Sequence, residues 1–182
     1  MCSHNIIGVN TKMKDDFDLK MLKKSEKNKI NSRNKGNAFE RKICSLLNEK
    51  FKTKDFNRTP GSGAYATNHH LPSHLKIYGD LITPKNHKFT YELKKGYNKE
   101  GVSSLFNKKS ELWKFLDQCE ITEQKSGRPC LLIWAQDNKN ILCFCRVGLF
   151  PEPPNTVKFA EYVIYEFKNI LNVDESWFFE QS

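Results

Sequence analysis

Apolar residues recur at helical spacing in two stretches of the chain, and each stretch predicts an amphipathic helix. The first helix is expected to begin at Asn34, an N-cap residue, and its apolar positions are mostly three or four residues apart. These positions are Phe39, Ile43, Leu46, Leu47 and Phe51. The second helix is expected over Leu105–Gln124, and the following Gly127-Arg128-Pro129 ends it, because glycine and proline stop helices.

Shorter apolar runs predict strands. The runs Ile77–Ile82 and Tyr91–Lys95 flank the turn-forming residues 84–87, so we expect the two runs to pair as a hairpin. Further strands are expected at Lys54–Thr59, Cys130–Ala135 and Ile141–Val147. The last two are joined by a turn at residues 137–140.

The order of these elements (helix, strands, helix, strands) predicts an α/β fold with a short mixed central sheet flanked by helices. We expect one domain over residues 34–182, in which the aromatic-rich segment Val157–Phe179 covers the core. Residues 1–33 contain few apolar residues and eight Lys/Arg against four Asp/Glu, which indicates a flexible basic leader.

Hydropathy and cysteine spacing favour a reducing compartment. No run has the length of a signal peptide or a membrane span, so we expect no membrane association and a location in the cytoplasm of a bacterial or phage-infected host cell. None of the six cysteines is in CxxC spacing, and we expect reduced thiols packed in the core. They are Cys2, Cys44, Cys119, Cys130, Cys143 and Cys145.

Charge is distributed unevenly along the chain, whose net charge is +9. Residues 1–114 hold 24 Lys/Arg against 11 Asp/Glu, a net of +13, whereas residues 115–182 hold 6 against 10, a net of −4. A polyanion is the natural partner of the basic part. The alternative is that Lys- and Asn-rich composition reflects an AT-rich genome and no particular partner.

Candidate chemistry lies in the predicted hairpin, within the basic part of the chain. Residues two apart in a strand point to the same face, so Glu92 and Lys94 project together, and the hairpin brings Asp80 beside Glu92. Two carboxylates with a lysine form a site for a divalent metal ion. We expect these three side chains to be exposed, and the alternative is that they are ordinary charges at a sheet edge.

Four motifs in order support the same interpretation: Lys35-Gly36-x-x-Phe39-Glu40-Arg41, then Arg58 with Gly61-Ser62-Gly63, then Asp80, then Glu92-x-Lys94. Over residues 34–147 the chain resembles the PD-(D/E)xK nuclease superfamily, and in particular its Holliday-junction-resolvase-like branch. It departs from the superfamily pattern at Gly79, where a proline is usual.

The resemblance implies a restriction-endonuclease-like core that cleaves DNA and leaves 5′-phosphate ends. It implies that Mg²⁺, with Mn²⁺ as a substitute, is held by Asp80, Glu92 and Glu40, and that Lys94 orients the attacking water. A glutamine of the second helix would contact the scissile phosphate or the nucleophile, either Gln118 or Gln124. DNA-backbone contacts are expected from Lys35, Arg41, Arg58, Gly61, Ser62, Gly63 and Lys95.

Cleavage of a four-way junction needs two symmetric incisions, so the resolvase interpretation predicts a homodimer. The aromatic tail Trp177-Phe178-Phe179 offers apolar surface for its interface, and the alternative is that these residues complete the core of the monomer. Two alternatives remain open: a restriction-like or DNA-repair endonuclease of the same fold, and a non-catalytic DNA-binding module. A zinc site at His69, His70 and His74 is disfavoured against DNA contact or solvent exposure, because no Cys or carboxylate lies nearby.

Overall fold

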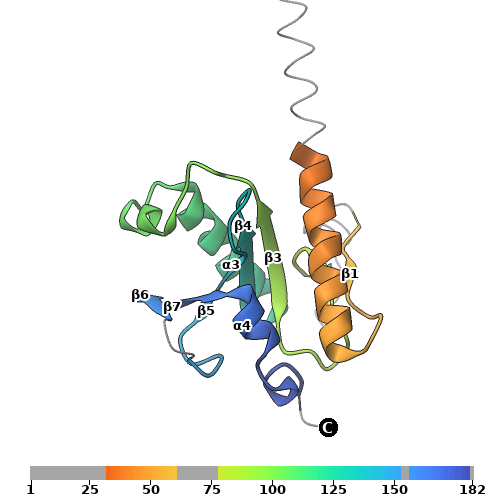
Figure 1. The fold of residues 1–182 in the computed structure, drawn as a ribbon. Coiled ribbons are helices and arrows are strands. Elements are labelled where there is room, and N and C mark those ends of the chain that lie inside the picture. Colours follow the sequence, from red (N-terminus) through yellow and green to blue (C-terminus); the bar gives the residue numbers. More distant parts are fainter. Residues whose placement is uncertain (1–31, 61–77, 153–155, 181–182) are drawn as a thin grey trace, which may run out of the picture. The chain divides into compact units, whose positions relative to one another are not determined.

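The computed structural model describes residues 32–60, 78–152 and 156–180 (Figure 1). The chain divides into two compact units, Met1–Asn37 and Ala38–Ser182, and the fold discussed below is that of the second unit. Residues 32–51 are helical, so the helix has already begun before Asn34 and the predicted N-cap is wrong. Within the described residues, no helix is both long enough and apolar enough to span a membrane.

The second unit is built on a five-stranded mixed sheet with the strand order β3-β4-β5-β7-β6. The strands are β3 (Thr90–Lys95), β4 (Cys130–Ala135), β5 (Leu142–Arg146), β6 (Val157–Phe159) and β7 (Tyr162–Glu166). β3 and β4 are parallel, and every other neighbouring pair is antiparallel. Two short strands, β1 (Asn57–Arg58) and β2 (Leu81–Ile82), form a separate antiparallel pair.

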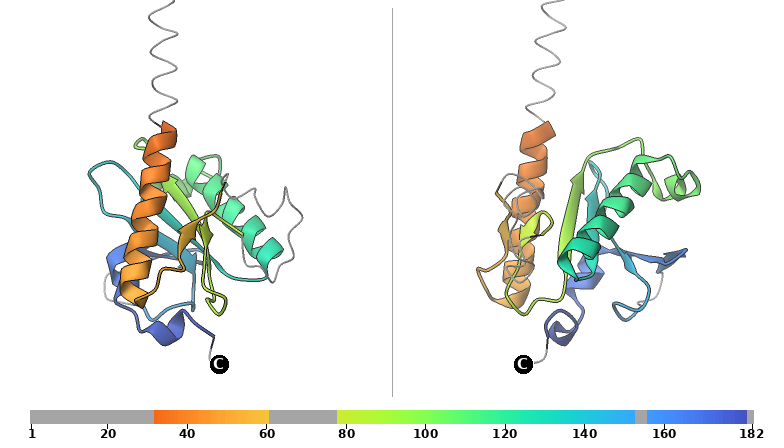
Figure 2. Two further views of the ribbon diagram at one scale, coloured as in Figure 1. Left: turned by 90° about the vertical axis from the view of Figure 1, so that its right-hand side faces the viewer. Right: turned by 180° about the vertical axis from the view of Figure 1, so that it is seen from behind.

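Helices cover both faces of the sheet (Figure 2). Helix α3 (Glu111–Ser126) follows the 3₁₀ helix η2 (Val102–Phe106) and connects β3 to β4, as a parallel pair requires. Its apolar side packs on one face of the sheet and forms a core of Leu112, Phe115, Leu116, Leu132 and Phe144 with their neighbours. The helical residues 38–51 pack on the other face through Phe39, Ile43 and Leu47.

Strand β3 is buried from both sides. Tyr91 and Leu93 point into the core under residues 38–51, and Glu92 points to the opposite face, under α3. This alternation follows from the two-residue period of a strand. The α/β class with a short mixed sheet flanked by helices is therefore confirmed, and β3 presents its polar residues to α3.

Two element predictions are wrong. Leu81–Ile82 pairs with β1 and not with β3, so the expected hairpin does not form, although Asp80 still contacts β3. The second helix begins at Glu111, because residues 102–106 form η2 instead. The strand Cys130–Ala135 has the predicted bounds.

The C-terminal segment does more than cover the core. It supplies β6 and β7 to the sheet, followed by α4 (Phe167–Leu171) and η3 (Glu175–Trp177). Phe178 is fully buried and completes the core, the second of the two predicted alternatives, whereas Trp177 is 41% exposed. The five cysteines in the described residues are free and buried, as predicted, and burial raises the pKa of Cys44 to about 11 and of Cys145 to about 12.

Candidate active site

Glu92 lies at the centre of the candidate site, on the face of β3 that α3 covers. Its side chain is only 1% exposed, so the prediction of an exposed carboxylate is wrong. Two side chains of α3 satisfy it: Thr122 Oγ1 donates to Glu92 Oε1 at 2.9 Å, and Gln118 Nε2 donates to Glu92 Oε2 at 2.7 Å. Such donors are needed because a buried carboxylate without hydrogen bonds is strongly disfavoured.

Lys94 shares the face of Glu92 and is bonded to the same glutamine. Its Nζ donates to Gln118 Oε1 at 2.8 Å, lies 3.5 Å from Glu92 Oε2 and sits 5.7 Å from the centre of the Phe115 ring. The Gln118 amide therefore bridges the lysine and the glutamate. Gln124, the competing glutamine, is exposed on the same helix and does not take this place.

Asp80 reaches the site across the outer edge of β3, where no strand of the described residues pairs. Its N–H donates to Tyr91 O at 2.8 Å, and its Oδ2 accepts the N–H of Leu93 at 2.8 Å. The side chain is 8% exposed. The carboxylate thus takes the backbone donor that a neighbouring strand would otherwise satisfy, and this places it next to Glu92.

Gly79 makes this close approach possible. Its φ is +82°, and a Cβ at this position would lie 2.5 Å from the carbonyl oxygen of Tyr91, closer than any side chain tolerates. The structure thereby explains why a glycine precedes the aspartate. Proline, which usually precedes the aspartate in the PD-(D/E)xK motif, could not adopt this φ.

The electrostatics of the site are unfavourable for two charged carboxylates without a cation. Burial, followed by the negative charge of Asp80, raises the pKa of Glu92 to about 7, although Lys94 and the Thr122 hydrogen bond lower it. A divalent cation between the two carboxylates would offset both effects. The oxygen donors are those that Mg²⁺ or Mn²⁺ prefers, so the residues fit such an ion.

A third protein ligand for this ion is not found among residues 32–60, 78–152 and 156–180, which contain no group of three His, Cys, Asp or Glu able to hold a metal. Glu40, the third predicted ligand, accepts a hydrogen bond from Arg58 Nε. β1 places Arg58 opposite Leu81, next to Asp80. Glu40 and Arg58 thus form an ion pair beside the site.

The predicted DNA-contacting residues come from several elements of the chain. Lys95 is bonded to Asp137 and to the carbonyl of Gln136, and Arg41 is exposed on the helix that spans 32–51. Lys35 lies on the same helix, in the first unit. The loop Gly61-Ser62-Gly63 and the histidines at 69, 70 and 74 lie outside the described residues.

Thr122 was not predicted from the sequence. The signal for it is positional: it lies four residues after Gln118, on the side of α3 that also carries Phe115 and Cys119. A polar residue in the buried stripe of a helix, in register with a glutamine, points toward a polar group on the facing strand, which here is Glu92.

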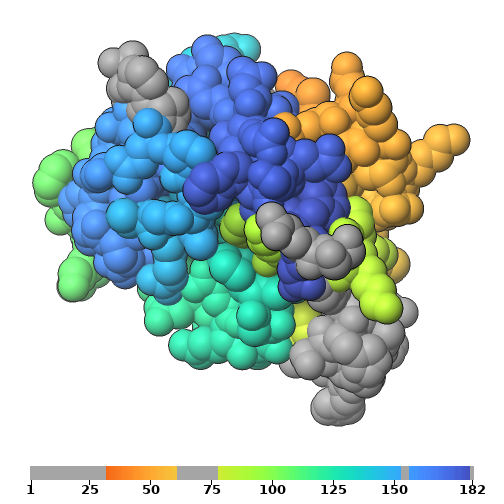
Figure 3. Space-filling view, turned by 90° about the horizontal axis from the view of Figure 1, so that it is seen from below, coloured from red at the N-terminus to blue at the C-terminus, as the bar shows by residue number. Residues whose placement is uncertain are grey.

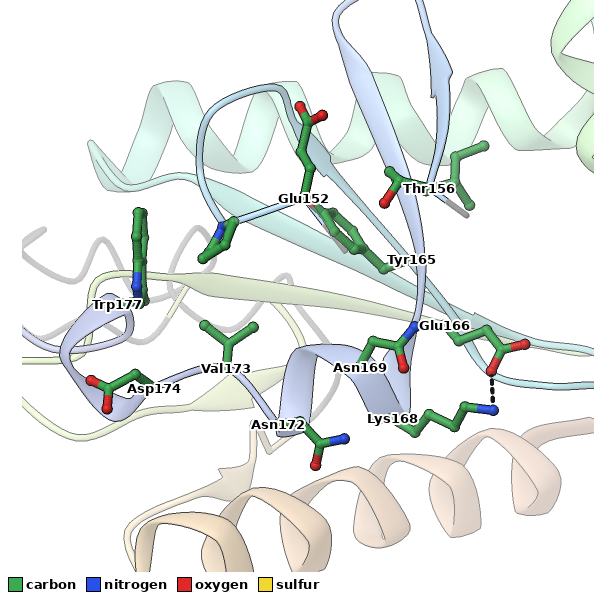
Figure 4. Close-up of a pocket in the computed structure, with 12 residues that line it drawn as sticks. Glu152, Thr156, Tyr165, Glu166, Lys168, Asn169, Asn172, Val173, Asp174 and Trp177 are labelled. Carbon is green, nitrogen blue, oxygen red and sulfur yellow. Dashed lines mark ion pairs between the residues drawn. The ribbon is translucent and has the colours of Figure 1, made fainter. Parts of the chain in front are cut away.

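A separate pocket of about 800 Å³ lies between β7, α4 and η3 (Figure 4). Its lining includes Tyr165, Trp177 and three carboxylates, those of Glu152, Glu166 and Asp174. No residue of the Glu92 site borders it. Its carboxylates would repel a DNA phosphate, so the pocket is not part of the candidate site.

The comparison with protein families gives one finding that bears on this geometry. The family model described as "Phage putative PDDEXK endonuclease" matches residues 31–179. That range contains Asp80, Glu92 and Lys94. No curated protein and no solved structure matches the chain.

Proposed function

Because the chain belongs to this family of phage PD-(D/E)xK endonucleases, we propose that it hydrolyses phosphodiester bonds of DNA at the site formed by Asp80, Glu92 and Lys94. The observation that carries the proposal is the Gln118 amide, which joins the lysine to a glutamate whose pKa is raised by burial and then by Asp80. A charged group held inside the protein at this energetic cost is typical of a functional site.

Asp80 and Glu92 are proposed to hold Mg²⁺, or Mn²⁺ in its place, with water and a phosphate oxygen of the substrate completing the coordination. When bound, this ion polarises the phosphate and lowers the pKa of a coordinated water. Glu40 is proposed to act through water and not as a direct ligand, because its carboxylate is occupied by Arg58.

Lys94 is proposed to orient the attacking water and to neutralise charge that develops on the phosphate. The hydrogen bond to Gln118 and the contact with the Phe115 ring orient the Lys94 ammonium group. The lysine therefore needs little rearrangement when the substrate binds. The water oxygen forms a bond to phosphorus, and the bond from phosphorus to the 3′ oxygen breaks. The 3′ oxygen takes up a proton, and the products are a 5′-phosphate and a 3′-hydroxyl.

Branched DNA is the proposed substrate, and a homodimer the proposed active species. The support is the motif order that resembles junction resolvases, together with the basic N-terminal part of the chain. Two symmetric incisions require two sites related by a two-fold axis. Trp177 remains available for the interface, whereas Phe178 does not.

The test is cleavage of a DNA panel in Mg²⁺ or Mn²⁺ and with a chelator. The panel contains a four-way junction, a flap, a nicked duplex, a linear duplex and a single strand. We expect metal-dependent cleavage and at least tenfold tighter binding of the junction than of the linear duplex, a difference of about 1.4 kcal/mol. A monomer that cleaves linear duplex as readily as junction would favour the restriction-like or repair alternative. A protein that binds but never cleaves would be a non-catalytic module.

A further inference from the structure

A second surface with the chemistry of a nucleic-acid contact lies on the outer side of α3. Phe106, at the end of η2, is 84% exposed, although Leu105 beside it is buried. The Phe106 ring meets Phe159 of β6 edge to face, with centroids 5.4 Å apart, and Phe159 meets Trp113 of α3 at 6.2 Å. Contiguous exposed apolar surface with polar residues at its rim is typical of an interaction site.

Hydrogen bonds hold the backbone around Phe106 and the ring of Trp113 in place. Trp113 Nε1 donates to the carbonyl of Leu105 at 2.9 Å, and Ser110 Oγ donates to the carbonyl of Ser104 at 3.0 Å. These bonds fix η2 against the start of α3. The aromatic surface therefore exists before any partner binds, which reduces the entropic cost of binding.

The charges around the rings are positive. Lys108 Nζ lies 6.0 Å from the centre of the Trp113 ring, and Lys109 follows it. Neither lysine forms an ion pair with any residue in the described parts of the chain, whereas Lys114 and Lys158 are paired with Glu111 and Glu152. Aromatic rings with an ammonium group beside them suit a ligand that has both π faces and negative charge.

The surface lies away from the candidate active site. Figure 1 shows η2 and β6 on the side of the sheet opposite to β1. In Figure 3, the green surface of the η2 segment lies near the blue surface of the last strands. Within the sheet, four inter-strand spacings, roughly 19 Å, separate β6, which carries Phe159, from β3, which carries Glu92.

We propose that Phe106, Trp113 and Phe159, with Lys108 and Lys109, form a platform on which unpaired bases of the DNA substrate stack. This rests on the proposed function and deepens it: the DNA substrate has an unpaired segment that reaches η2, the start of α3 and β6. Charge complementarity favours this occupant over a second copy of the chain, because two such surfaces would bring four lysines together.

The experiment measures binding by fluorescence anisotropy in a Glu92→Gln background, which prevents cleavage. The probes are a labelled single strand, a blunt duplex of the same length and a duplex with one unpaired arm. We expect Phe106→Ala to weaken binding of the single strand and of the armed duplex about tenfold, and of the blunt duplex less than about twofold. Phe106→Trp should retain the affinity, and Phe106→Leu, apolar but without a π face, should not.

Val147→Ala provides the control, because Val147 is also an exposed apolar residue, 47% exposed, but is not part of the platform. It should leave all three affinities unchanged. Sedimentation of wild type and Phe106→Ala is measured in parallel. A dimer that Phe106→Ala dissociates, an equal loss for all three probes, or no loss for any of them would each overturn the platform.

The binding experiment tests the platform separately from the cleavage experiment that tests the proposed nuclease activity. Metal-dependent cleavage by the wild type with no effect of Phe106→Ala on binding would overturn the platform alone. Selective loss of single-strand binding in a protein that never cleaves would support the platform and overturn the nuclease assignment.

Discussion

Gln118 and Glu92 are joined by a hydrogen bond of 2.7 Å although 26 residues separate them. The same amide accepts from Lys94 Nζ through its oxygen, so the orientation of one side chain sets both groups of the candidate site. Gln118 belongs to α3, whereas Glu92 and Lys94 belong to β3. The packing of the helix on the sheet therefore determines the distances between these three side chains.

Replacing Gln118 should therefore impair cleavage without loss of the fold. We expect Gln118→Ala to slow cleavage on the order of 100-fold, because Lys94 and Glu92 lose their common partner and shift. Gln124→Ala, an exposed substitution on the same helix, should cleave at the wild-type rate. Single-turnover rates on the preferred DNA give the comparison, and equal rates for the two variants would remove Gln118 from the site.

Lys94 and its neighbour Lys95 provide a second matched pair. Lys94→Met should abolish detectable cleavage, because the stem is kept and only the ammonium is lost. Lys95→Met should retain most activity, since Lys95 is bonded to Asp137 and the carbonyl of Gln136. Both proteins should remain folded by circular dichroism. If Lys94→Met cleaves at the wild-type rate, the assignment of the site is wrong.

Gly79→Ala should displace Asp80, because the new methyl group would meet the Tyr91 carbonyl at 2.5 Å. Gly96→Ala is the control: its φ is also positive, at +96°, but nothing lies within 4 Å of a Cβ there. Both should lose roughly 1–2 kcal/mol of folding stability from the backbone alone. Only Gly79→Ala should lose further stability and cleavage activity. Urea unfolding and cleavage rates measure the two effects, and identical losses would contradict the explanation.

The metal-free protein should become less stable as the pH rises from about 4.5 to about 8. The folded pKa of Glu92 is raised to about 7, so between these values the folded state binds a proton that the unfolded state has lost. Stability therefore falls through this window, on the order of 1–3 kcal/mol. Thermal unfolding in chelator should show the decline, and Glu92→Gln should reduce it. A stability that rises over this window, with no difference between the two proteins, would refute the assignment.

Deleting residues 1–31 should weaken DNA binding while leaving the described fold intact. The deleted segment carries seven Lys against four Asp/Glu, and each lost phosphate contact lowers the slope of log affinity against log salt by about one. Binding titrations at several salt concentrations measure this slope. An unchanged slope would show that the segment does not contact DNA.

The elements that the sequence predicted well are those whose pattern is local. Cys130–Ala135 is a continuous apolar run between turn residues, and it forms β4 with those bounds. The hairpin was wrong because strand pairing is not local. Leu81–Ile82 pairs with β1, more than 20 residues upstream. The Asp80 carboxylate accepts the backbone N–H of Leu93 on β3 instead.

In the candidate site, too, the local pattern was predicted from the sequence and the contacts between distant segments were not. The Glu92-x-Lys94 spacing and the preceding aspartate could be recognised along the chain, but their burial could not, because α3 supplies it from a distant part of the sequence. Thr122 carries no motif, and its role depends on the face of α3 that packs on β3. The choice between Gln118 and Gln124 was decided by the same packing.

The buried cysteines have a practical consequence for studying this protein in solution. Thiols whose pKa burial raises to about 11 or above hold little thiolate at neutral pH, so they react slowly with alkylating reagents. A Val157→Cys variant in a Cys2→Ser background would then offer one exposed, fast-reacting thiol among the described residues, on the same strand as Phe159. A fluorophore attached there would report the approach of a DNA arm in real time, with the native cysteines of the core left in place.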